Sequence, residues 1–136
     1  LLPETDKFIK SSDKVIGVGW RDDVRPYFAI SDCLAFPSYR EGFPNVVMQA
    51  GAMELYSIVS DINGCNEIIQ EKINGTIVPP KSSKALYEAM KGVLAQQTEL
   101  REKKNSYRKI IVERYERHYI WQELLKEYQK LEKIEV

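Results

Sequence analysis

The loop from Pro37 to Asn45 holds the residues of this sequence best suited to chemistry. It places an acid, Glu41, directly before Gly42, and it leads into a helix predicted to begin at Pro44. No Ser, Thr, Asp or Asn stands just before Pro44, so the first backbone amides of that helix lack a side-chain cap. Uncapped amides form the positive end of a helix, where a phosphate can bind without a lysine.

The amides of Asn45, Val46 and Val47 are therefore predicted to bind a diphosphate, with Gly42 letting the backbone come close to it. Two roles for Glu41 remain open. Its carboxylate either caps the helix and is structural, or it is free to contact a ligand. Removing the charge separates the two roles, because the first predicts lost stability and the second predicts lost function.

Other reactive groups lack the neighbours that catalysis requires. Gly17-Val18-Gly19 begins like a dinucleotide fingerprint, but Asp22 occupies the place of the third glycine and would repel a pyrophosphate. Gly19 is instead expected to end a strand and to let the chain pass near a flat ligand such as a base. The single histidine, His118, and two cysteines without CxxC spacing predict neither a metal site nor a nucleophile.

Charge and hydropathy narrow the class of partner. Twenty basic and twenty acidic residues cancel, so a nucleic acid lacks its main electrostatic attraction. No apolar run approaches the roughly 20 residues that span a bilayer. No signal segment opens the chain, so we expect a cytoplasmic protein. Because the sequence begins at Leu1 without a methionine, we also expect a further domain upstream.

The elements that must position the loop follow from short apolar runs separated by helical patterns. Predicted strands cover residues 15–19, 33–36, 57–60 and 76–78. Apolar strands without alternation indicate a parallel sheet buried on both faces, so the predicted class is α/β with a Rossmann-like sheet flanked by helices. Ligands of such sheets bind beyond the carboxyl ends of the strands, which is where the loop after residue 36 lies.

The pattern after Ser82 is helical only. Ser82 can cap a first helix, a second is predicted from Glu99 to Arg114, and a short helix is expected earlier, over 66–71. The C-terminal helical segment, 98–136, ends in an amphipathic helix from Tyr119 to Ile134. Its apolar stripe is larger than a short helix needs, so we expect it to pack across a domain boundary.

The loop and the helix after it resemble the signature of retaining glycosyltransferases of the GT-B fold, family four. The resemblance covers Pro37–Ala50 and continues through Val18–Trp20, Asp23–Tyr27, Ser60–Ile69 and Asn74–Pro80. It implies that residues 1–136 are a fragment of a longer enzyme, part of its C-terminal donor-binding domain. Such enzymes transfer a sugar from a UDP- or GDP-sugar to an acceptor with retention, and need no metal or other cofactor.

The resemblance also implies roles for individual residues. Glu41 would be the catalytic residue beside the donor sugar, the amides after Gly42 would hold the diphosphate, and Gln49 would bind the ribose. The residues expected to bind the donor are Gly19, Tyr39, Gly42, Phe43, Pro44, Asn45, Val46 and Gln49. The expected acceptor is a saccharide or a lipid-linked sugar held by an upstream domain, in surface or capsular polysaccharide synthesis. A peripheral association with the inner face of the cell membrane fits such an acceptor.

Three departures from the family pattern bear on these expectations. Gln49 replaces a glutamate, so it can still accept a hydrogen bond but carries no charge. Glu54 and Tyr56 stand where glycine and proline are usual, so the helix is expected to end without a left-handed cap residue, at a cost of about 1 kcal/mol. The basic residues that neutralise the diphosphate lie outside this chain, and the isolated chain is therefore expected not to turn over.

Two alternatives to a glycosyltransferase remain. A degenerate donor domain could bind a nucleotide or a protein partner without catalysis, which would fit the changes at Gln49, Glu54 and Tyr56. A nucleotide-sugar epimerase has a related architecture, but it would need acid–base groups that this sequence lacks.

Overall fold

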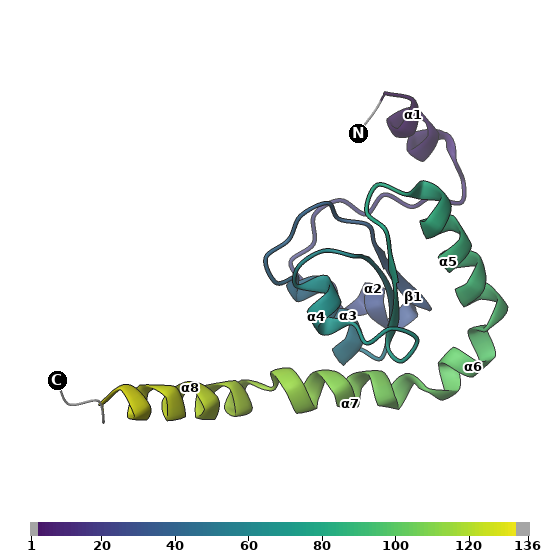
Figure 1. Cartoon of the computed structure of the whole chain (residues 1–136). Coiled ribbons are helices and arrows are strands. Elements are labelled where there is room, and N and C mark those ends of the chain that lie inside the picture. The colour runs from purple at the N-terminus through teal and green to yellow at the C-terminus, as the bar shows by residue number, and fades with distance from the viewer. Residues whose placement is uncertain (1–2, 133–136) are drawn as a thin grey trace.

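A three-stranded parallel sheet lies at the centre of the molecule, as the computed structural model of residues 3–132 shows (Figure 1). Its strands are β1 (Cys33–Phe36), β2 (Tyr56–Ser60) and β3 (Gly75–Val78). They lie in the order β1-β2-β3, so that β1 and β3 form the edges of the described sheet. Cys33 pairs with Tyr56 and Ser57 with Gly75. The α/β class and the Rossmann-like parallel sheet predicted from the sequence are confirmed.

Helices join the strands and continue after them. The helices before β3 are α1 (Pro3–Ser11), α2 (Arg25–Ile30), α3 (Asn45–Ala52) and α4 (Cys65–Ile68). Those after β3 are α5 (Ser83–Ala95), α6 (Gln97–Glu102), α7 (Lys104–Tyr115) and α8 (Arg117–Glu132). Ser82 caps α5 as expected, because its Oγ accepts a hydrogen bond from the Ala85 amide. Figure 1 shows α7 and α8 running in line, with α8 leading away from the sheet.

The middle strand, β2, is buried over its whole length because helices cover both faces of the sheet. On one face Val59 shares a cluster with Val47 of α3 and Ile111 of α7. On the other face Ile58 packs with Val93 of α5. Burial of such a side chain contributes about 1.5–3 kcal/mol to folding. The two clusters therefore fix where the carboxyl ends of the strands, and the loops that follow them, must lie.

The strand predicted over residues 15–19 does not form. Residues 15–20 have no regular structure, and Val15, Ile16 and Val18 are exposed. A strand needs a neighbour for its backbone amides and carbonyls, and within residues 3–132 nothing pairs with this segment. The segment has the apolar residues of a strand, but among the described residues it has no neighbouring strand to pair with its backbone. The prediction of four strands was wrong for this reason.

The helix predicted from Glu99 to Arg114 is divided at Lys103, which separates α6 from α7. The division lets Leu100 and Tyr107 both pack against the cluster around Tyr56. The Tyr107 hydroxyl also donates to the Leu100 carbonyl at 3.1 Å. The short helix predicted over 66–71 ends earlier, at Ile68.

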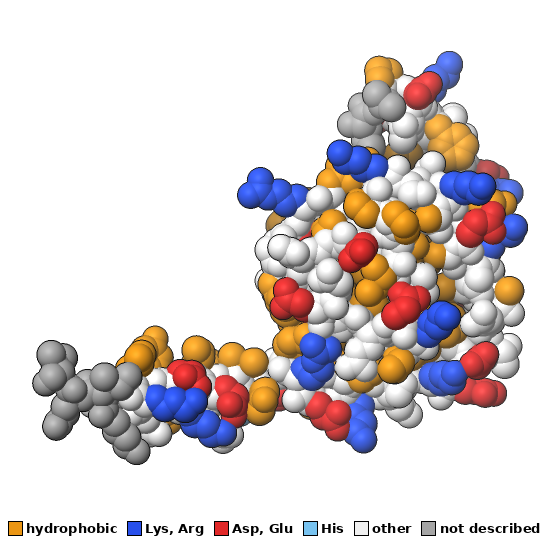
Figure 2. Space-filling model, viewed as in Figure 1, with side chains coloured by type: hydrophobic (Ala, Val, Ile, Leu, Met, Phe, Trp, Pro, Cys, Tyr) orange, Lys and Arg blue, Asp and Glu red, His pale blue; other side chains and the backbone are white. Residues whose placement is uncertain are grey.

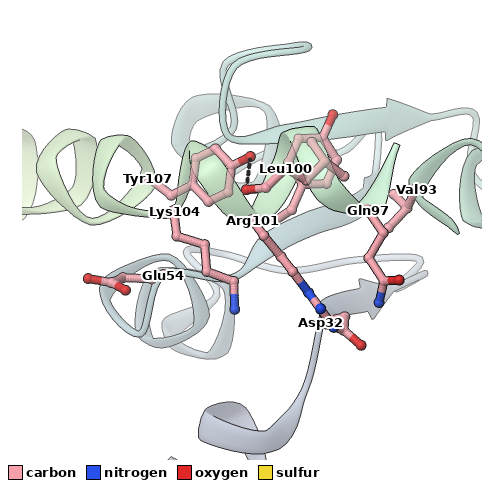
Figure 3. Close-up of a pocket in the computed structure, with 9 residues that line it drawn as sticks. Asp32, Glu54, Val93, Gln97, Leu100, Arg101, Lys104 and Tyr107 are labelled. Atoms are coloured by element: carbon pink, nitrogen blue, oxygen red, sulfur yellow. Dashed lines mark hydrogen bonds and ion pairs between the residues drawn. The ribbon is translucent and has the colours of Figure 1, made fainter. Parts of the chain in front are cut away.

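A small cavity at the amino ends of the strands accompanies this division (Figure 3). Asp32, just before β1, pairs with Arg101 of α6 at 2.8 Å, and this hydrogen bond lowers the pKa of Asp32. The cavity holds only ≈ 10 Å³, whereas ligand pockets measure about 300–1,000 Å³. It also lies at the edge opposite the loop after β1. The cavity is therefore too small to be a ligand site. The ion pair beside it connects the start of β1 to α6.

Helix α8 begins at its own cap. Glu116, between α7 and α8, accepts hydrogen bonds from the amides of His118 at 2.8 Å and Tyr119 at 3.2 Å. None of the α8 residues is buried, and its apolar side chains, including Trp121 and Leu124, are exposed to solvent. Figure 2 shows hydrophobic side chains along this helix. Packing of this stripe across a domain boundary stays a prediction, and its expected end at Ile134 lies outside the described residues. Among helices of the described chain, none has the length and apolarity to cross a membrane.

The end of α3 differs from the expectation that it lacks a left-handed residue. Glu54 itself adopts that conformation, with φ 67°. Its amide donates to the Gly51 carbonyl at 3.0 Å, and the Leu55 amide donates to the Ala50 carbonyl at 2.9 Å. These two bonds form a Schellman motif, which normally has glycine at the left-handed position. The helix is closed in the usual way, but by a residue for which the conformation is strained.

We expect Glu54→Gly to raise the free energy of unfolding by about 0.5–1 kcal/mol. The left-handed conformation costs a non-glycine residue roughly 1–2 kcal/mol, and the greater freedom of glycine in the unfolded chain removes about 0.4–1 kcal/mol of the gain. Urea denaturation measures the change. Glu54→Ala is the control, since alanine removes the carboxylate but keeps the strain. A glycine variant no more stable than the alanine variant would contradict the expectation, because the strain at Glu54 would then be no larger than the roughly 0.4–1 kcal/mol lost to the freedom of glycine.

Candidate functional site

The loop after β1, which we call the motif loop, consists of residues 37–44 and lies at the carboxyl edge of the sheet. It begins after Phe36, the last residue of β1, and ends where α3 starts at Asn45. Two other loops of the same edge reach it. Lys81, after β3, places its Nζ 5.8 Å from the centre of the Tyr39 ring. The loop after β2 touches it through Gly64, immediately before α4.

Gly64 allows the backbone of α4 to approach the motif loop closely. A Cβ at this position would lie 2.2 Å from the Gly42 carbonyl oxygen and 2.9 Å from Pro44 Cδ. The residue also has φ +77°, a conformation that side chains rarely allow. In the sequence, Gly64 is marked only by its place within Ser60–Ile69, one of the segments that resemble the family. The contact itself joins segments far apart in the chain, and no local pattern could reveal it.

Glu41 is half-buried and faces the interior of the motif loop. Its Oε1 accepts a hydrogen bond from Ser38 Oγ at 2.7 Å. No side chain caps α3, whose N-cap residue is Pro44, so the capping role that the sequence left open for Glu41 is excluded. The carboxylate also lies near Cys65, at the start of α4. Burial raises the pKa of the Cys65 thiol to about 11, and the negative charge of Glu41 adds to the effect.

The first turn of α3 leaves fewer free amides than predicted. The Val47 amide donates to the Pro44 carbonyl at 3.1 Å, so the expectation that it is free was wrong. This bond belongs to the tighter turn that often begins a helix. The amides of Asn45 and Val46 have no acceptor among the described residues. They are the pair at this helix start that can receive an anion.

Gln49 lies apart from this group, on the exposed side of α3. It lines a pocket of ≈ 410 Å³ together with Ala52, Met53 and the segment 22–25. Gly19, with φ +64°, precedes that segment and is exposed. Hydrogen bonds from Arg25 lower the pKa of Asp23 to about 2, so the carboxylate beside the pocket stays ionised. The structure thus brings the residues from Tyr39 to Val46 together and places Gln49 and Gly19 towards the segment before α2.

Metal ligands do not gather at this edge or elsewhere within residues 3–132. No group of three or more histidine, cysteine, aspartate or glutamate side chains is close enough there to hold an ion. The negative charge of a bound anion would have to be balanced by backbone amides and basic side chains. Near the motif loop these include the Asn45 and Val46 amides, with Arg40 on the motif loop and Lys81 on the loop after β3.

The motif loop and the start of α3 therefore lie where open parallel α/β sheets bind their ligands, and free amides at a helix start are suited to an anion. The family model for glycosyl transferases group 1 matches residues 2–96. The chain belongs to this family, and its fold is a partial Rossmann-like domain of the GT-B type.

Two curated relatives illustrate the family, and one solved structure illustrates the fold. The UDP-Gal:alpha-D-GlcNAc-diphosphoundecaprenol alpha-1,3-galactosyltransferase of Escherichia coli is 32% identical over 75 residues, which are 55% of this chain and 19% of the relative. The capsular polysaccharide biosynthesis glycosyltransferase CapM of Staphylococcus aureus is 24% identical over 86% of this chain and 31% of its own. HepE of Anabaena in complex with UDP superposes with a TM-score of 0.85 at 19% identity, over 93% of this chain and 36% of that one. The chain therefore spans a third or less of these curated relatives.

We expect Gly64→Ala to destabilise the protein by roughly 1–3 kcal/mol, the range for a residue forced into a disfavoured backbone conformation. It should also displace the motif loop, because the new methyl group meets backbone at Gly42. Urea denaturation measures the first effect, and hydrogen exchange of the loop amides measures the second. Gly92→Ala in α5 is the matched control, since its Cβ meets nothing within 4 Å and alanine favours a helix. Similar behaviour of both variants would contradict the close approach at Gly64.

Proposed function

We propose that this chain is the donor-binding part of a retaining glycosyltransferase that uses a UDP- or GDP-sugar. The observation that carries the proposal is the placement of Glu41 and the free amides of Asn45 and Val46 on one loop and the helix start after it. A nucleotide diphosphate needs amide donors for its phosphates, and a transferred sugar needs a polar group at the reacting carbon. Both stand within a few residues of each other in a chain of the group 1 family.

In the proposed complex the diphosphate lies at the start of α3 and the sugar lies beside Glu41. Gln49 binds the ribose through its amide, as a neutral acceptor and donor. Gly19 lies near the base, while Tyr39, Phe43 and Pro44 form the wall of the site. No metal and no other cofactor takes part. The HepE structure bound to UDP and the UDP-Gal specificity in the name of the Escherichia coli relative support a nucleotide-sugar donor.

The proposed acceptor is a saccharide or a lipid-linked sugar, held by a part of the protein outside this chain. The Escherichia coli relative is named for a diphosphoundecaprenol acceptor, and CapM is named for capsular polysaccharide. These names support a place in surface polysaccharide synthesis. We further propose that the protein works in the cytoplasm at the inner face of the cell membrane, a location that fits a lipid-linked acceptor.

The second candidate is a non-catalytic nucleotide-binding module of the same fold. The observation that favours it is the uncharged Gln49 in a pocket next to Asp22 and Asp23. A neutral side chain at this point holds a ribose with fewer charge-assisted bonds. Turnover separates the two candidates, because both predict nucleotide binding.

The test is a panel of UDP- and GDP-sugars on the protein that contains this chain as its donor-binding part. Release of nucleoside diphosphate is followed with and without EDTA. We expect release from one or a few donors, unchanged by EDTA, and a product with the anomeric configuration of the donor. Binding without release of nucleotide would support the module. An absence of binding across the panel would contradict both candidates.

We expect Glu41→Gln to lower turnover by about 10²-fold or more while leaving the melting temperature nearly unchanged. The carboxylate caps no helix, so its loss costs little stability, but contacts that strengthen in the transition state are lost. Melting and transfer rate should be measured on the same preparation. Glu88→Gln, at an exposed glutamate of α5 paired with Lys91, is the control. A large loss of stability with intact turnover would refute the assignment of Glu41.

A further inference from the structure

The motif loop rests on α7 through a contact between two aromatic rings. Phe43 lies edge to face with Tyr115, with ring centres 5.4 Å apart and an angle of 65° between the planes. This edge-to-face arrangement is a favoured geometry for aromatic pairs. Other parts of the loop are less enclosed, since Tyr39 is 69% exposed and a Cβ added at Gly42 would meet nothing within 4 Å.

Tyr115 is itself held in place by hydrogen bonds to α4. Its hydroxyl donates to the Glu67 carbonyl at 3.0 Å, and Arg114 Nη2 donates to the same carbonyl at 2.7 Å. The Arg114 guanidinium also lies 5.0 Å from the centre of the Tyr115 ring. The carbonyl belongs to the helix whose start, at Gly64, contacts the motif loop. Helix α4 therefore meets the motif loop directly at Gly64 and is linked to it a second time through Tyr115, which bonds to the Glu67 carbonyl.

The helix that carries Tyr115 is also fixed to α3. Arg108 Nη1 donates to the Ala52 carbonyl at 2.6 Å. A Cβ at Gly51 would lie 2.7 Å from Ile111 Cγ1, so the two helices meet at a glycine. The ring of Tyr115 thus has a set position relative to the α3 start, where the Asn45 and Val46 amides lie. The motif loop is held relative to this ring by the contact of its residue Phe43 with Tyr115.

We propose that Tyr115 is a positioning residue of the donor site, which acts through Phe43 to set the place of Glu41 relative to the Asn45 and Val46 amides. The inference rests on the proposed function and adds a residue that neither the motif nor its resemblance includes. Tyr115 stands outside the segment matched by the family model, which ends at residue 96. Its role is to keep the loop in one arrangement, so that the donor sugar meets Glu41 when the diphosphate is bound.

A displacement of the loop by about 1 Å is enough to matter, since misplacement of this size can lower a rate by up to about 10²-fold. Tyr115→Leu is expected to lower turnover by about 10-fold to 10²-fold in the protein that contains this chain. Phe43→Leu should do the same. Because both substitutions remove the contact between the two rings, the double variant should lose no more than the more impaired single variant. Tyr115→Phe keeps the ring and should retain most of the turnover.

Two further measurements separate positioning from a general loss of stability. Hydrogen exchange of the motif-loop amides should increase in Tyr115→Leu and stay near the wild-type rate in Tyr115→Phe. Melting temperatures are recorded for every variant, and kinetics are measured well below them. Tyr87→Leu, at an exposed tyrosine of α5, is the matched control and should change neither loop exchange nor turnover.

The outcomes also separate this inference from the proposed function. Wild-type protein that neither binds nor consumes any nucleotide sugar would overturn both. Normal wild-type turnover with Tyr115→Leu unchanged in rate and loop exchange would overturn the role of Tyr115 alone. Additive losses in the double variant would do so as well, because they would show that Tyr115 does not act through Phe43.

Discussion

The central strand β2 sets the position of everything else in this molecule. It is hydrogen-bonded to a parallel neighbour on each side and is buried from Tyr56 to Ser60. Because all three strands run the same way, their carboxyl ends meet at one edge, and the loops after them are forced together. The contact of Gly64 with Gly42 and the approach of Lys81 to Tyr39 follow from this constraint. The direction of the strands therefore determines where the candidate site lies, and the individual side chains determine what that site can bind.

The sequence predicted the elements whose signals are local and missed those that depend on a neighbour. Apolar runs and a serine cap were enough for the three strands and for the start of α5. The run at 15–19 is also apolar, but its backbone has no partner in the described chain. The break at Lys103 serves Leu100 and Tyr107, which pack on the same cluster. Such requirements come from the tertiary structure, and a pattern within one segment does not contain them.

The site shows the same division. Glu41 and the amides after it could be predicted, because they belong to one loop and one helix start. The Val47 amide is not free because it is hydrogen-bonded within the tight first turn of α3. Residue types alone do not specify how tight that turn is. Gly64 and Tyr115 contact the loop across large separations in sequence, and only the packed structure places them there. Glu54 is a third case, since the sequence showed the unusual residue but not that the backbone keeps its left-handed turn.

Helix α8 is an arm that extends away from the sheet (Figure 1). Its 16 residues make an arm of about 24 Å at 1.5 Å per residue. The arm starts at the Glu116 joint, the next residue after Tyr115. A displacement of about 2 Å at the far end turns such an arm by only about 5°. A contact made by the exposed apolar stripe would therefore turn the arm only slightly about Glu116, the residue next to the ring on which the motif loop packs.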